Sequence, residues 1–111
     1  MKAEELRIGN WIEAVASMGN YPMKMTEYNF VSLINNPNCA NPIVLTPEIL
    51  EKCGFVSNPY QNRFELGQVH IQYCGVRNMF WIENYSAELK SLHQLQNLTY
   101  ALTGEEITFE P

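Results

Sequence analysis

The chain contains no aspartate, and its few basic residues form no cluster. All twelve acidic residues are glutamate, the seven lysines and arginines are scattered, and the formal net charge is -5. A nucleic-acid-binding surface needs Lys and Arg gathered on one face. The composition therefore argues against direct DNA binding. Because the glutamates are scattered too, it also argues against a nucleic-acid mimic.

Metal-ligand spacings and long apolar runs are also missing. The three cysteines, Cys39, Cys53 and Cys74, form no CxxC pair, so we expect no metal, no cofactor and reduced thiols in a cytoplasm. The opening MKAEELRIGN lacks the apolar run of a signal peptide. No stretch approaches the roughly 18 apolar residues of a membrane span. We therefore expect a cytoplasmic protein that does not associate with membranes.

The common catalytic motifs are absent as well. The sequence has no GxSxG, GxxxxGK[ST], GxGxxG or HExxH pattern. Glu65, Glu83 and Glu88 could supply paired carboxylates, but each stands among polar neighbours on an expected solvent face. The sequence therefore favours a protein that is not an enzyme.

The apolar content and two local helix signals of the sequence predict a folded chain with two helices. Apolar residues make up 46% of the 111 residues, enough for one domain to bury a core. In LTPEILEKCGF, Thr46 suits a helix N-cap, Pro47 the first helical position and Gly54 the stop. We predict helices at about Pro47–Cys53 and Ser91–Thr103, the second from leucines at helical spacing.

Turn signals and β-forming residues predict that the rest is mainly strand. In the region before residue 35, Tyr28, Phe30 and Val31 favour strands. We therefore expect one α+β domain over residues 1–111, in which a curled, mainly antiparallel sheet, SH3-like in part, carries the two helices. The predicted strands are Leu6–Met18, one or two within Met23–Ile34, Arg63–Leu66, Gln68–Cys74, Arg77–Asn84 and an edge strand at Ile107–Phe109.

The stretch SLHQLQNLTYALTG carries no charged residue. Within it His93, Gln96, Asn97 and Tyr100 fall at i, i+3, i+4 and i+7, which makes one polar stripe on the helix. These side chains could be buried and bonded to the backbone of loops. They could instead face a partner, because neutral polar groups are desolvated more cheaply than charges. The pattern leaves both interpretations open.

The last long predicted strand has apolar residues on both faces. Phe80 and Ile82 share one face, while Met79 and Trp81 share the other. Either both faces are covered, or Met79 and Trp81 form an exposed patch for a partner, with Tyr85 close by in the sequence. We take Met79, Trp81 and Tyr85, together with the four residues of the polar stripe, as the candidate protein interface.

Three blocks, EELRIGNWI, PIVLTPEILEKCGF and HQLQNLTYALTGEEI, resemble a group of small uncharacterised proteins encoded by bacteria and by their phages and mobile elements. Members open with an ELRIGNW-like stretch and close with HQLQNLYFALTGEEL. The chain departs from this pattern at Thr99 and Tyr100, where the group usually has two aromatic residues. The resemblance implies an accessory gene acting in a bacterial host cell. It brings no catalytic residues.

These observations predict a protein-binding module that modulates or inhibits a host protein or ribonucleoprotein complex. Anti-defence and anti-CRISPR proteins are examples by analogy of gene type. One alternative is a small regulator that binds RNA or a ribonucleoprotein. The other is a ligand-binding domain or enzyme with a pocket near His70 and His93, which would line it together or with a cysteine.

Overall fold

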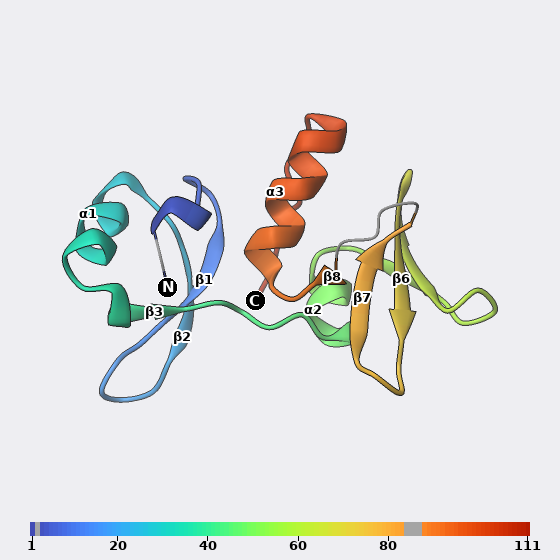
Figure 1. Cartoon of the computed structure of the whole chain (residues 1–111), viewed down its shortest axis with the longest axis horizontal. Helices are drawn as coiled ribbons and strands as arrows, with labels where there is room; N and C mark the ends of the chain where they lie inside the picture. Colours follow the sequence, from blue (N-terminus) through green and yellow to red (C-terminus); the bar gives the residue numbers. More distant parts are fainter. Residues whose placement is uncertain (2, 84–87) are drawn as a thin grey trace.

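The computed structural model describes residues 1, 3–83 and 88–111, and its elements form two lobes (Figure 1). The N-terminal lobe contains β1 (Trp11–Ala14), β2 (Tyr21–Lys24), α1 (Glu27–Asn35) and β3 (Ala40–Asn41), with short 3-10 turns at Ala3–Glu5 and Pro37–Cys39. The C-terminal lobe contains α2 (Pro47–Lys52), β4 (Val56–Asn58), β5 (Arg63–Leu66), β6 (Val69–Cys74), β7 (Met79–Ile82) and β8 (Glu88–Leu89). The last helix, α3 (Leu92–Thr103), lies between the two lobes.

The strands form two antiparallel sheets, which together with the helices confirm the α+β class. The N-terminal sheet has the order β2-β1-β3, and the C-terminal sheet has the order β4-β5-β6-β7-β8. The sequence predicts one curled sheet, SH3-like in part. In the structure the strands instead form two sheets, and neither closes into an SH3-like barrel. Successive strands of the larger sheet are neighbours, as expected of a meander.

Local capping signals explain α2 and α3, and both predicted helices are confirmed. The Thr46 hydroxyl accepts a hydrogen bond from the Ile49 amide at the start of α2. Ser91 forms a capping box with Gln94 at the start of α3. Gly104 ends α3 in the left-handed region, at φ 74°, where a residue with a Cβ would be strained.

The strands predicted within Met23–Ile34 are wrong over most of that range, which holds α1 instead. Thr26 caps this helix and makes a capping box with Asn29. Burial of Leu33 against the N-terminal sheet stabilises the helix and outweighs the β preference of its aromatic and branched residues. The described part of the chain therefore has a third α-helix that the sequence did not predict.

Three strand predictions also need correction. The strand predicted over Leu6–Met18 is confined to Trp11–Ala14. The stretch Ile107–Phe109 forms no strand. Ile107 and Phe109 are nevertheless buried, because their side chains pack into the apolar cluster. The strand predicted to end at Asn84 ends at Ile82 in the structure, and Asn84 itself lies outside the described residues.

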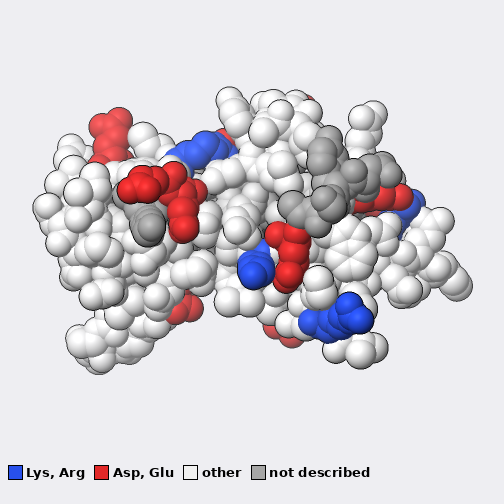
Figure 2. Space-filling view, in the orientation of Figure 1, with Lys and Arg blue, Asp and Glu red and all other residues white. Residues whose placement is uncertain are grey.

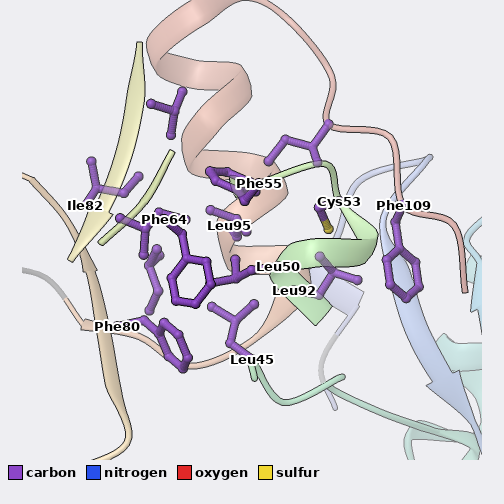
Figure 3. Close-up of a cluster of buried hydrophobic side chains, with 14 residues drawn as sticks. Leu45, Leu50, Cys53, Phe55, Phe64, Phe80, Ile82, Leu92, Leu95 and Phe109 are labelled. Carbon is purple, nitrogen blue, oxygen red and sulfur yellow. The ribbon is translucent and has the colours of Figure 1, made fainter. Parts of the chain in front are cut away.

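Each lobe has its own cluster of buried apolar side chains. In the C-terminal lobe, residues of α2, the sheet, α3 and the tail meet in one cluster (Figure 3). A smaller cluster in the N-terminal lobe comprises Ile12, Met25, Leu33 and Ala40. The ring of Trp11 in β1 meets Phe109 of the larger cluster edge-on at 5.1 Å between centroids. Apolar packing therefore continues from one lobe to the other.

Candidate functional site

The polar stripe of α3 binds the N-terminal lobe of the same chain. The Gln96 side chain accepts a hydrogen bond from the Trp11 amide at 2.8 Å and donates one to the Gly9 carbonyl at 3.2 Å. The Asn97 carbonyl oxygen accepts from the Asn10 side chain at 2.8 Å. We call these contacts the joint. Gln96 and Asn97 therefore bond to groups of the same chain, as the first of the two interpretations of the stripe expects.

Arg7 extends the joint along α3. Its Nε donates to the Asn97 side chain at 2.8 Å, and its guanidinium forms an ion pair with Glu106. The guanidinium carbon lies 4.7 Å from the centroid of the Tyr100 ring, within the range of a cation–π contact. Tyr100 remains 45% exposed. Tyr100 is therefore the most exposed member of the stripe.

His93 is buried, and its burial changes how readily its imidazole binds a proton. Its Nδ1 lies 3.2 Å from the Ser91 hydroxyl. Burial lowers the pKa of His93, because the charged imidazolium is poorly solvated there, and the Glu5 carboxylate opposes this to a smaller extent. The folded chain therefore binds this proton less readily than the unfolded chain does.

The free energy of unfolding should consequently fall at acidic pH. The contribution of neutral His93 is fully present above the unfolded-state pKa of about 6.5 and is lost as the pH falls from there toward the lower folded-state pKa. We expect His93→Gln to lose less stability than the wild type between about pH 7.5 and about pH 5. Urea unfolding at both pH values measures this. An equal loss in wild type and His93→Gln would contradict the assignment.

Met79 and Trp81 lie on the outer face of the larger sheet. Phe80 and Ile82 face the core with 1% and 4% exposure, so the predicted division of the strand is confirmed. Met79 and Trp81 are half-buried, which makes this face less open than a free apolar patch. Tyr85 lies outside the described residues.

Charged side chains beside Trp81 on this outer face neutralise one another. Arg63 forms ion pairs with Glu65 and Glu83, and His70 Nδ1 lies 2.9 Å from Glu83. Hydrogen bonds from Arg63 and Asn58 lower the pKa of Glu65. Arg63 and His70 are thus already paired with carboxylates, and the described residues of this face provide no cluster of free positive charge for phosphate.

The two histidines do not share a pocket. His70 lines a hollow of about 330 Å³ beside Glu83, while His93 lines neither this hollow nor the larger one next to it. Cys53 lines the larger hollow, but burial raises its pKa to about 12, so the thiol stays protonated. His70 and His93 therefore do not line one hollow together, whereas His70 and Cys53 each line a hollow of their own.

A surface that the sequence did not predict lies on α1. Tyr28, Val31 and Ile34 are spaced three residues apart and are 85%, 60% and 66% exposed, respectively. The helix has a single charged residue, Glu27. In Figure 2 the end of the molecule that carries α1 is white with several red groups. We call these three side chains the α1 row. Large apolar side chains grouped in this way are typical of interaction surfaces.

The described residues contain no candidate metal centre and no candidate membrane-spanning helix. Within residues 1, 3–83 and 88–111, no three His, Cys, Asp or Glu side chains are grouped so that they could hold a metal ion. Over the same ranges no helix combines the length and the apolar character that crossing a bilayer requires.

No protein family, no curated protein and no solved structure matches this chain.

Proposed function

We propose that the chain is a protein-binding module that presents the α1 row to a partner protein. The observation that carries this proposal is the exposure of Tyr28, Val31 and Ile34 on one short helix. Covering a large apolar side chain contributes about 1.5–3 kcal/mol before the costs of association. Three such side chains side by side therefore supply a substantial part of a binding free energy.

The partner should offer an apolar groove with little charge. With Glu27 as its single charged residue, α1 fits such a groove, in the way that amphipathic helices are recognised. Exposed amides at Asn35, Asn36 and Asn38 follow directly and can form a polar rim. The resemblance to phage and mobile-element proteins favours a host protein or ribonucleoprotein complex, with inhibition of a defence system as one hypothesis.

Two observations favour a protein partner over RNA. Lys and Arg do not gather on the face shown in Figure 2, where blue atoms lie apart from one another and beside red ones. Arg7 and Arg63 are both held by glutamates. An RNA platform needs free positive charge next to exposed aromatic side chains.

Affinity capture with matched variants tests the proposal. The tagged chain and its Val31→Glu, Trp81→Ala and Val76→Glu variants are each incubated with nuclease-treated host lysate, and the bound proteins are quantified. Val76 is 99% exposed in a turn and serves as the matched control. We expect one stoichiometric protein complex with wild type, Val76→Glu and Trp81→Ala, and its loss with Val31→Glu, because a buried carboxylate is costly.

Other outcomes contradict the proposal. If Trp81→Ala loses the complex and Val31→Glu keeps it, the interface is the outer face of the larger sheet. A wild-type complex that is captured from untreated lysate but not from nuclease-treated lysate indicates an RNA-mediated contact. A wild-type dimer that becomes monomeric with Val31→Glu, measured by sedimentation, shows that the α1 row binds a second copy of the chain.

A further inference from the structure

The outer face of the larger sheet carries a continuous row of side chains, one from each of its five strands. Directly opposed residues of neighbouring strands point to the same face of a sheet and lie about 4.8 Å apart, the strand spacing. From β4 to β8 the strand register opposes, in order, Asn58, Arg63, Gln72, Trp81 and Glu88. We call these five side chains the cross-strand row.

The described elements leave this face of the sheet uncovered. The opposite face supplies Phe64, Ile71 and Phe80 to the large apolar cluster, where it packs against α2 and α3. Both helices lie on one side of β6 and β7 in Figure 1. No member of the cross-strand row is buried, because four are partly exposed and the fifth, in β8, is exposed. A ligand can therefore reach the row from solvent.

The charged groups around Trp81 are paired with one another, so the face fits an uncharged ligand. Arg63 reaches from β5 across β6 to Glu83 and also donates to Glu65. A guanidinium has five N–H donors, and these two bonds leave others for a ligand. Phosphate or carboxylate groups would be repelled by Glu65, Glu83 and Glu88.

The cross-strand row combines an aromatic ring with planar hydrogen-bonding groups. An indole ring such as that of Trp81 has a π face with partial negative charge, which attracts C–H groups. Gln72 on one side of it carries a donor and an acceptor, and Glu88 on the other side carries acceptors. Sugar rings with equatorial hydroxyls match this arrangement, because they have flat C–H faces and hydroxyls around the edge.

We propose that the cross-strand row binds a neutral, extended oligosaccharide whose sugars have equatorial hydroxyls, with one ring stacked on Trp81. Its neighbouring rings bond Gln72 and Arg63 on one side and Glu88 on the other. The strand spacing of about 4.8 Å is close to the length of one sugar ring, so successive rings meet successive side chains. Because its ion pairs already hold Arg63 in place, ordering this side chain costs little on binding.

Titration of the full chain with cellotetraose, followed by two-dimensional NMR, tests this proposal. Cellotetraose is neutral and extended, maltotetraose has the same sugars in a curved chain, and the C6-oxidised form of cellotetraose carries a carboxylate on every ring. We expect cellotetraose to cause saturable shifts at the Gln72 amide and the Trp81 indole N–H. Maltotetraose should bind about tenfold more weakly, as the loss of one or two hydrogen bonds predicts, and the oxidised form should not bind. The indole signal of Trp11, in the other lobe, is the internal control and should not move.

Substitutions within the row assign the binding to these side chains. Trp81→Ala should weaken cellotetraose binding about tenfold, because the stacking contact is lost, and Trp81→Phe should restore part of the affinity. Gln72→Ala should weaken it about fivefold, as the loss of one hydrogen bond predicts. Gln68→Ala is the matched control, since Gln68 is exposed in the β5–β6 turn and its truncation should leave binding unchanged. Gln72→Ala keeps the test decisive if Trp81→Ala folds poorly.

Several results would overturn the proposal: no saturable shift with millimolar cellotetraose, equal binding of the oxidised form, or shifts confined to the N-terminal lobe. Unchanged affinity in both Trp81→Ala and Gln72→Ala would overturn it too. The outcome is separate from partner binding by the α1 row. Val31→Glu should bind cellotetraose like the wild type, and Trp81→Ala should still capture the protein complex.

Discussion

Replacing Leu95 by alanine is expected to lower the free energy of unfolding by about 2–5 kcal/mol, the range for a buried leucine. Leu95 lies on α3 with 0% exposure and belongs to the large apolar cluster of the C-terminal lobe (Figure 3). Truncation removes its contacts and leaves a cavity that well-packed neighbours fill only in part. Urea unfolding followed by tryptophan fluorescence measures the effect.

The matched control for this prediction is Leu102→Ala on the same helix. Leu102 is 43% exposed, so its truncation should cost less than about 1 kcal/mol. Equal midpoints for Leu95→Ala and the wild type would mean that α3 packs through a different face.

Gln96→Ala is the second substitution with a large expected effect, a loss of about 2–4 kcal/mol. The Gln96 side chain is 1% exposed and bonds both the Trp11 amide and the Gly9 carbonyl. Truncation leaves both groups without their partner, at about 1–3 kcal/mol for each buried group, reduced where water can enter. Because these bonds join the two lobes, the Trp11 amide should also exchange its hydrogen faster.

Gln61→Ala is the matched control for Gln96→Ala. Gln61 is exposed in the turn between β4 and β5, so its truncation should change the free energy of unfolding by no more than about 0.5 kcal/mol. If both variants unfold at the same urea concentration and the Trp11 amide exchanges as in the wild type, Gln96 does not hold the lobes together.

The helices that the sequence predicts correctly are those with strong local signals. Thr46 and Pro47 begin α2, and Ser91 and Gly104 bound α3, through interactions between residues only a few positions apart. The β6 strand is also predictable, because Val69 and Ile71 alternate with polar residues and are buried. Such signals need no knowledge of the rest of the fold.

Long-range contacts decide the parts that the sequence does not predict. The α1 helix contains aromatic and branched residues that favour strands, and burial of Leu33 in the N-terminal lobe outweighs them. The capping pair of Thr26 and Asn29 was a local signal for this helix, but asparagine at that position is weaker than the usual Glu or Gln. The sequence does not predict the α1 row, because Tyr28, Val31 and Ile34 lie together only when the segment is a helix.

The polar stripe of α3 likewise depends on long-range contacts that the sequence does not reveal. Its spacing on α3 is readable from the sequence, but the choice between a buried and a partner-facing stripe depends on a contact between Trp11 and Gln96, 85 residues apart. No local pattern encodes that separation. Because Gln96 and Asn97 already bind the N-terminal lobe, we propose the α1 row as the partner surface instead.

Hydrogen–deuterium exchange of the chain, free and in the captured complex, tests most directly that α1 is the partner-binding surface. We expect exchange to slow in peptides that cover residues 27–35, because a partner that covers the α1 row excludes water and opposes opening of the helix. Peptides over residues 92–103 should change little, since the joint is already formed in the free chain. Unchanged exchange over residues 27–35, with protection confined to residues 69–82, would contradict this account.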